Sequence, residues 1–113
     1  MARKTVEEKA YKYADLAIWN AKGNLKEGDA IDGYVIDKDE FEGKFGTVTN
    51  FILDQDGKGA LIKVSGSSVI KNKFAEIPMG CHVWIKYVGM VETKRGAKKS
   101  YEVEYDDEDK VEL

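Results

Sequence analysis

The sequence contains one cysteine and one histidine among its 113 residues, and none of its apolar runs is long enough to cross a membrane. The single cysteine, Cys81, excludes an internal disulfide framework, and with His82 as the only histidine the chain has no ligand set of the zinc type. The N-terminus begins Met1-Ala2-Arg3-Lys4 and continues into a charged segment, so it predicts no signal peptide. We therefore expect a cytoplasmic protein of a reducing compartment, with no metal, no cofactor and no membrane contact.

The shortage of histidine and cysteine also argues against catalysis. Cys81 and His82 are adjacent, so in a strand their side chains point to opposite faces and do not form a nucleophile–base pair. The run Lys44-Phe45-Gly46-Thr47 lacks the spacing of a phosphate-binding loop, and Asp54 and Asp56 lack the further ligands of a calcium loop. We expect that this protein is not an enzyme.

The net charge of −3 conceals an uneven distribution along the chain. Six acidic residues and one base lie between Glu104 and Leu113, whereas the preceding 103 residues have a slight excess of bases. A block of like charges repels itself, so we predict a disordered acidic tail over 106–113 that folds back weakly on a basic groove and competes with phosphate. A role in solubility alone is the alternative. The tail residues expected to contact partner proteins are Asp106, Asp107, Glu108, Asp109, Val111 and Leu113.

The rest of the chain divides into two patterns. Within 1–27, the capping-box spacing from Thr5 to Glu8 and apolar residues at helical intervals up to Gly23 predict an N-terminal helix. Within 28–105 the period changes to two and turn residues recur at short intervals, which predicts a small antiparallel β domain. The predicted strands are 30–37, 45–53, 60–65, 83–91 and 100–105, with a short helix inside 67–77.

Three strands, a helix and two more strands are the order of an OB-fold, a five-stranded β-barrel. Gly33 lies inside the first strand, where a small barrel needs a bend. The main competitor is an SH3-like barrel, but the helix between the third and fourth strands favours the OB-fold because it closes the bottom of that barrel. We predict a mainly β chain with an OB-fold barrel, an N-terminal helix and a disordered acidic tail.

Alternation along the strands predicts which side chains face outward. In 83–91 the aliphatic Val83 and Ile85 face the core, so Trp84 and Lys86 face outward. The same alternation places Tyr34 and Lys63 outside, whereas it leaves the second strand unassigned and makes Phe51 a weaker candidate. Covering of Trp84 by the N-terminal helix is the alternative to a binding role, and Tyr11, Tyr13 and Trp19 are expected to pack.

Outward aromatic rings beside lysines suit nucleic acid, because rings stack on bases and ammonium groups neutralise phosphates. The segment 93–99 contains four bases, in one of the two loops that flank the groove of OB-folds, and Lys44 lies in the other. The alternative is that 93–99 is only a soluble turn. The candidate nucleic-acid-binding residues are Tyr34, Lys44, Phe51, Lys63, Trp84, Lys86, Lys94, Arg95, Lys98 and Lys99.

Three segments also carry a likeness to a known family. They are Gly28-Asp29-Ala30-Ile31-Asp32-Gly33-Tyr34, the run from Gly46 to Leu53, and Gly80 followed by Val83-Trp84-Ile85-Lys86-Tyr87-Val88-Gly89 and Lys98-Lys99-Ser100-Tyr101. These patterns resemble small bacteriophage-type single-stranded-DNA-binding proteins with an OB-fold. The acidic end resembles the tails by which such proteins recruit replication partners, although it ends in Val-Glu-Leu and not in the Pro-Phe of the bacterial family.

The resemblance implies a protein that coats single strands in DNA replication, recombination or repair without sequence preference, commonly as a homo-oligomer, in the host cytoplasm if it is phage-encoded. In this interpretation Tyr34 and Trp84 stack on bases, Lys63 and Lys86 form the groove floor, and the bases of 94–99 clamp phosphates. Two alternatives stay open. One is an OB-fold RNA-binding protein, which needs contacts to the 2′-hydroxyl. The other is a protein-interaction module that binds no nucleic acid and docks a partner on its aromatic face.

Overall fold

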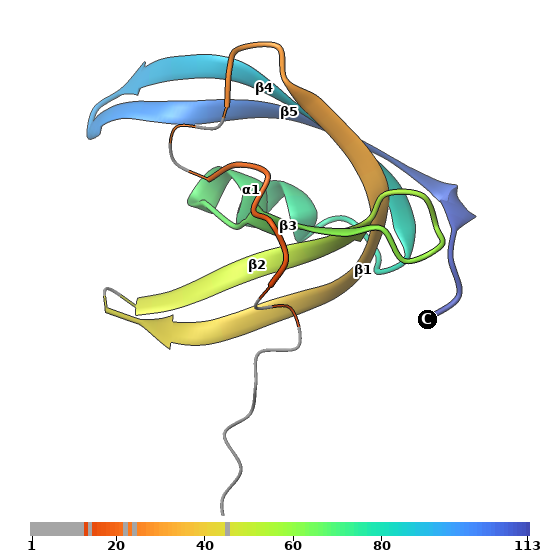
Figure 1. Cartoon of the computed structure of the whole chain (residues 1–113). Helices are drawn as coiled ribbons and strands as arrows, with labels where there is room; N and C mark the ends of the chain where they lie inside the picture. Colours follow the sequence, from red (N-terminus) through yellow and green to blue (C-terminus); the bar gives the residue numbers. More distant parts are fainter. Residues whose placement is uncertain (1–12, 14, 22, 24, 45) are drawn as a thin grey trace, which may run out of the picture.

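The computed structural model describes residues 13, 15–21, 23, 25–44 and 46–113, with the side chain of residue 41 left aside. Over these residues it contains five strands and one helix in the predicted order (Figure 1). The prediction of a mainly β protein is confirmed. The elements are β1 (Ala30–Gly43), β2 (Gly46–Asp54), β3 (Leu61–Ser65), α1 (Ser68–Phe74), β4 (Cys81–Thr93) and β5 (Gly96–Lys110).

The five strands form one antiparallel sheet in the order β3-β2-β1-β4-β5. The sheet curves around α1, but no backbone ladder joins β3 to β5 within the described part of the chain, so the prediction of a closed barrel is wrong. A segment before β1 lies along the edge of β3 instead. The N–H of Trp19 donates to the carbonyl of Lys63 at 2.8 Å, and the N–H of Lys63 donates to the carbonyl of Ala17 at 3.0 Å.

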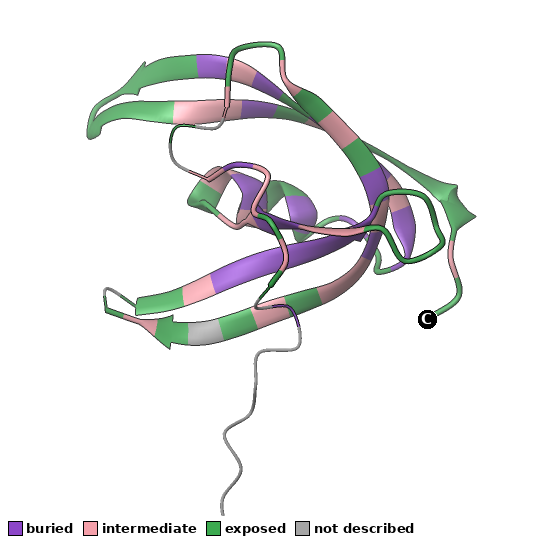
Figure 2. Ribbon diagram, in the orientation of Figure 1, coloured by how far each residue is buried: buried purple, intermediate pink, exposed green. Residues whose placement is uncertain are grey.

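The core lies between the inner face of the sheet and α1. The side chains of Leu53, Val64, Val83 and Ile85 are fully buried there, and α1 adds Ile70 and Phe74 in its two buried positions (Figure 2). Each such side chain contributes about 1.5–3 kcal/mol of burial free energy. The predicted inward orientation of Val83 and Ile85 is confirmed.

The residues that start and stop the one described helix lie close together in the sequence, so the helix is short. Ser67 is the N-cap, and its hydroxyl accepts a hydrogen bond from the N–H of Ile70. Pro78 and Gly80, the latter with a φ of 93°, follow within a few residues and turn the chain into β4. No helix within the described residues has the length and apolar character needed to cross a membrane.

The predicted N-terminal helix is not found in the described residues. Residues 1–12, 14 and 22 lie outside them, and Tyr11 falls in that stretch. From Tyr13 to Gly23 the described residues form turns and a single parallel bridge from Ile18 to Lys63. The edge of β3 explains the difference, because extended backbone at residues 17–19 supplies the hydrogen bonds that this edge otherwise lacks. Tyr13 is buried and Trp19 packs on the core, as predicted for these aromatics.

The predicted disordered tail is also wrong. β5 continues to Lys110, which lies opposite Cys81, and the N–H of Val111 donates to the carbonyl of Gly80 at 3.0 Å. The ladder with β4 satisfies the backbone, and one of the tail carboxylates hydrogen-bonds to the imidazole of His82, so the segment is ordered in spite of its charge. Residues 106–110 are therefore part of the edge strand β5, and residues 111–113 follow it.

The strands of both long hairpins extend further than the sequence predicted. β1 runs on to Gly43, and the predicted loop 93–99 is mostly strand, with a two-residue turn at Lys94 and Arg95. The hydroxyl of Thr93 shapes this turn, since it donates to the carbonyl of Gly96 at 2.6 Å and accepts from the N–H of Arg95 at 3.2 Å. The fold thus presents two long β-hairpins that point the same way from the body, with the C-terminus on the opposite side (Figure 1).

Candidate functional site

The predicted nucleic-acid-binding residues are distributed over two surfaces and the core. One surface is the hairpin cleft, the hollow bounded by the β1–β2 hairpin, the β3–α1 connection and the β4–β5 hairpin. The other is the Trp84 face, the outer side of β1, β4 and β5 around Trp84. Two predicted residues lie in neither. Phe51 is buried and packs on Phe74 with ring centroids 4.5 Å apart, and Lys63 is buried with its backbone bonded to residues 17 and 19.

The hairpin cleft includes a cavity of about 550 Å³. Its walls come from four segments of the chain, which are residue 20, β2, the β3–α1 connection and β5. The polar groups of its side chains are hydroxyls, an amide and two ammonium groups. A second cavity of about 420 Å³ shares Thr47 with the first. Its lining includes Lys71 and Lys38, and the ammonium group of Lys38 lies 3.0 Å from the carboxylate of Glu40, which also lines it. The polar groups that line the first cavity are Asn20, Thr47, Ser65, Ser67, Ser68, Lys98, Lys99 and Tyr101.

Asn20 fixes the shape of this cleft. Its side-chain carbonyl accepts from the N–H of Ser65 at 2.7 Å, while its amide donates to the carbonyl of Ser65 at 2.9 Å and to the hydroxyl of Tyr101 at 3.4 Å. One buried amide therefore connects the end of β3 to β5 across the open side of the sheet. Trp19 supports the same contact, because its ring lies 6.1 Å from that of Tyr101.

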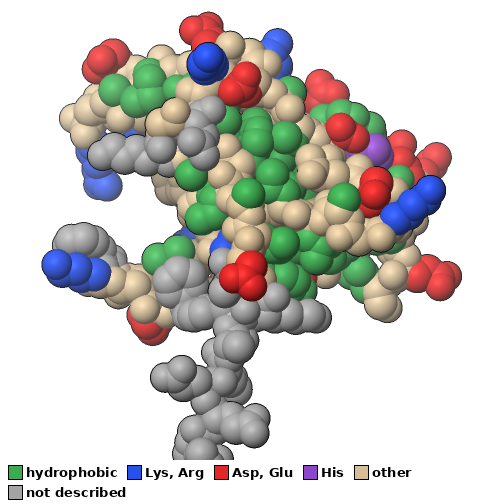
Figure 3. Space-filling model, in the orientation of Figure 1, with side chains coloured by type: hydrophobic (Ala, Val, Ile, Leu, Met, Phe, Trp, Pro, Cys, Tyr) green, Lys and Arg blue, Asp and Glu red, His purple; other side chains and the backbone are tan. Residues whose placement is uncertain are grey.

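The bases of the two hairpins border the cleft. Lys98 is exposed and Lys99 half-buried in its lining, Lys94 and Arg95 are exposed at the tip of the same hairpin, and Lys44 lies at the end of the other. Figure 3 shows Lys and Arg side chains at both hairpins on the cleft side of the molecule. Cations beside hydroxyl and amide groups suit a polyanionic chain, because the cations neutralise phosphates and the polar groups hydrogen-bond to phosphate and sugar.

The Trp84 face is organised as a row of aromatic rings. Trp84 is 41% exposed, and the imidazole of His82 stacks on it with centroids 4.1 Å apart and planes 16° apart. Tyr34 follows, 4.7 Å from His82. The outward orientation predicted for Tyr34, Trp84 and Lys86 is confirmed.

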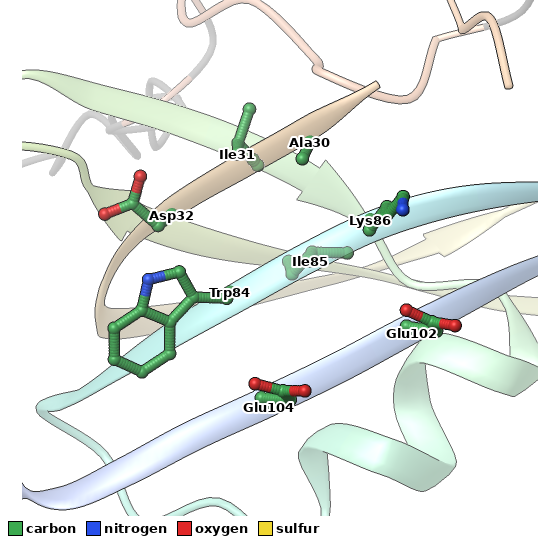
Figure 4. Close-up of a pocket in the computed structure, with 8 residues that line it drawn as sticks. All are labelled: Ala30, Ile31, Asp32, Trp84, Ile85, Lys86, Glu102 and Glu104. Carbon is green, nitrogen blue, oxygen red and sulfur yellow. The ribbon is translucent and has the colours of Figure 1, made fainter. Parts of the chain in front are cut away.

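Carboxylates flank this row on both sides. Asp32 of β1 and Glu104 of β5 lie opposite Trp84 in the two ladders, and a cavity of about 420 Å³ opens between them (Figure 4). Glu102 lies opposite Lys86, the one base in the cavity lining. An anionic border of this kind repels phosphate, which disfavours the stacking role predicted for Tyr34 and Trp84 and the groove-floor role predicted for Lys86.

His82 binds the C-terminal segment to this face. Its Nδ1 lies 2.7 Å from a carboxylate oxygen of Asp109, its Nε2 lies 2.8 Å from one of Asp32, and the hydroxyl of Tyr34 donates to Asp109 at 3.0 Å. Partial burial lowers the pKa of His82, but the two carboxylates outweigh it and the net shift is upward. The hydrogen bonds from His82 and Tyr34 lower the pKa of Asp109, and Asp109 in turn raises that of Tyr34.

The C-terminal segment therefore lies away from the hairpin cleft. β4 spans nine steps from Cys81, opposite Lys110, to Met90, opposite Lys99 in the lining of the cleft. At about 3.3 Å per residue this is on the order of 30 Å. The prediction that the acidic tail covers the basic groove of its own chain is wrong, because residues 106–111 are held at the far end of β4.

Sequence reasoning missed the polar lining of the cleft. Ser67 and Ser68 precede Val69 and Ile70, which is a pattern typical of a helix N-cap. A capping role accounts for these serines, so the pattern gave no reason to place them in a binding surface. Asn20 gave no signal, because its partners are 45 and 81 residues away in the sequence.

Comparisons with family models, with curated proteins and with solved structures found no match.

Proposed function

We propose that this protein binds single-stranded DNA in the hairpin cleft without sequence preference, and that it protects single strands during replication, recombination or repair. The observation that supports this most strongly is the cleft itself, with Lys98 and Lys99 beside hydroxyl and amide groups between two projecting hairpins. In this proposal the sheet is an open variant of the OB-fold. Strand order and helix position match that fold, in which the same two hairpins flank the oligonucleotide groove.

The lack of sequence preference follows from the chemistry of the lining. Lysine contacts to phosphate position a strand but carry no base information. The hydroxyl groups can both donate and accept hydrogen bonds, so they do not select one base. Phosphate neutralisation is the main source of affinity, since the exposed Trp84 stands among carboxylates on another surface. The proposed contacts are therefore those of Lys98 and Lys99, with Lys44, Lys94 and Arg95 at the two hairpin ends.

Charge reversal in the cleft tests this proposal. We expect Lys98→Glu with Lys99→Glu to weaken binding of oligothymidylate at least tenfold at low salt, and to reduce the slope of log affinity against log salt by about 1.4, which corresponds to two phosphate contacts on a single strand. The measurement is fluorescence anisotropy of a labelled oligonucleotide. Ribo-oligomers in the same titration separate DNA binding from the RNA alternative.

Two controls sharpen the test. Lys58→Glu with Lys110→Glu makes the same change in net charge at positions in the β2–β3 turn and at the end of β5. Trp84→Ala removes the exposed ring of the other surface. At 0.1 M salt, where the cleft variant is compared with them, we expect affinity within about twofold of the wild type for both controls, because charges more than about 10 Å from the bound strand are screened. An equal loss of affinity in the controls and in the cleft variant would refute the assignment of the cleft.

A further inference from the structure

The cavity beside Trp84 lies between two rows of side chains on the outer side of the sheet. The first row is Asp32, Trp84 and Glu104, and the second is Ala30, Lys86 and Glu102, each listed from β1 through β4 to β5. Residues directly opposite one another in antiparallel strands share a face, so the two rows belong to one surface. Ala30 is small, so the second row leaves space beside the indole, where the cavity of about 420 Å³ opens.

The indole of Trp84 has one open face. The imidazole of His82 stacks on its other face, with centroids 4.1 Å apart. His82 does not line the cavity, so the cavity lies on the side of the indole away from His82. Figure 4 shows the indole extending from β4 between Asp32 and Glu104. A partly exposed tryptophan in a cavity offers a ligand both an apolar surface and the negative face of its ring.

The walls of the cavity are anionic. They contain the carboxylates of Asp32, Glu102 and Glu104 and one base, Lys86. Glu102, Glu104 and Lys86 make no ion pair with any described residue, whereas one oxygen of Asp32 lies 2.8 Å from Nε2 of His82. The lining therefore has a net negative charge beside an open aromatic face, which is a combination that attracts a cation and repels phosphate.

The geometry of these walls favours a guanidinium over an ammonium group. A guanidinium is planar, so it stacks on an indole while its N–H groups donate to a carboxylate beside the ring. Glu104 lies directly across the ladder from Trp84 and is exposed, so its carboxylate is available to such a group.

Carboxylates also continue past the cavity along β5. Asp106 follows Glu102 and Glu104 on the same face, opposite His82, and it is exposed. Four strand positions separate Glu102 from Asp106, which is about 13 Å of extended backbone. A row of this length matches a chain segment that carries several cations better than it matches one small cation.

We propose that the Trp84 face is a docking site for a basic segment of a partner protein. One arginine side chain of that segment occupies the cavity, with its guanidinium stacked on the open face of Trp84 and hydrogen-bonded to Glu104. Further basic side chains lie along the carboxylates of β5. Lys98 and Lys99 line a different cavity, so this docking neither depends on the proposed DNA binding nor competes with it.

A labelled peptide tests the docking. The probe is a fluorescein-labelled short peptide of alternating arginine and serine, and the measurement is its anisotropy with the full chain at about 0.1 M salt, without nucleic acid. We expect saturable binding that Trp84→Leu and Glu104→Gln each weaken about fivefold or more. A peptide with lysine in place of arginine has the same charge and is expected to bind about threefold more weakly, because an ammonium group lacks the planar fork.

Lys86 provides a test of opposite sign. Lys86→Gln removes the one base of the lining and is expected to strengthen binding about twofold or more. Glu92→Gln is the matched control for Glu104→Gln, because Glu92 is exposed on the same sheet, eight positions along β4 from Trp84. Its distance exceeds the screening length of about 10 Å, so we expect it to leave the affinity unchanged.

Three results would overturn the proposal. The first is a wild-type chain that gives no saturable binding of the arginine peptide up to about 1 mM. The second is an equal loss of affinity in Glu92→Gln and Glu104→Gln, which would reduce the effect to net charge. The third is half-displacement of the peptide by an equal concentration of free arginine, which would make the cavity a site for a small cation and not for a protein segment.

Discussion

Replacement of Asn20 by alanine is expected to destabilise the protein by about 2–4 kcal/mol. The reason is that one buried amide satisfies three groups at once, the N–H and the carbonyl of Ser65 and the hydroxyl of Tyr101. Without it, these groups lose their partner in a site that is only partly open to water. The loss of any one of them costs on the order of 1–3 kcal/mol when it stays buried.

Thermal and chemical denaturation followed by circular dichroism measure this effect, with an expected fall in melting temperature of about 10 °C or more. Asn72→Ala is the matched control, since Asn72 is exposed on α1, and it is expected to change stability by less than about 0.5 kcal/mol. If Asn20→Ala unfolded at the same denaturant concentration as Asn72→Ala, the amide would not hold β3 to β5.

The second large effect is expected at Gly66, which follows β3. A Cβ at this position would lie 2.7 Å from the carbonyl oxygen of Thr49, and 3.2 Å from the ring of Phe51. The N–H of Gly66 already donates to that same carbonyl at 2.7 Å, so the two backbones have no room to separate without losing the bond. Gly66→Ala is therefore expected to cost about 2–3 kcal/mol through overpacking and loss of this hydrogen bond.

Ser68→Ala is a suitable comparison for Gly66→Ala, because Ser68 is exposed two residues later and its replacement fills no occupied space. Urea titrations of both variants give the difference in the free energy of unfolding. A Gly66→Ala protein as stable as Ser68→Ala would mean that β2 and the β3–α1 connection are not packed as closely as the structure has them.

Local patterns in the sequence predicted most of the sheet. The alternation of Val83, Ile85 and Tyr87 with Trp84 and Lys86 assigned both faces of β4, because a two-residue period leaves only one choice once the aliphatic side is known. The order of the elements followed from the turn residues between them. The same reasoning had no means of assigning β2, where six consecutive residues from Thr49 to Asp54 are all buried.

The errors came from contacts between segments far apart in the chain. Lys63 has the parity of an outward residue, but residues 17–19 lie against its backbone and it is buried. Asp109 belongs to an acidic run that local reasoning assigned to disorder, yet His82 and Tyr34 hold it in place. The acidic border of Trp84 escaped notice for the same reason, since Asp32 and Glu104 meet the ring only through the strand register.

The structure separates onto two surfaces the bases and aromatic rings that the sequence analysis had placed on one. The hairpin cleft collects bases and hydroxyl groups around an amide that fixes its shape, whereas the Trp84 face combines rings with carboxylates. Phosphate groups are attracted to the bases of the cleft and repelled by the carboxylates of the Trp84 face. On the proposed function, DNA binding therefore uses the bases of the cleft, and substitutions on the Trp84 face are expected to leave it intact.

The most direct test of the proposed DNA binding is a fluorescence titration of the Trp84→Phe variant with oligothymidylate at low and moderate salt. Trp19 is then the only tryptophan, and it packs on Tyr101 in the lining of the cleft. We expect saturable quenching whose midpoint moves to higher oligonucleotide concentration as salt rises. Unchanged Trp19 fluorescence, together with unchanged anisotropy of a labelled oligonucleotide at low salt, would contradict the proposal that this protein binds single strands.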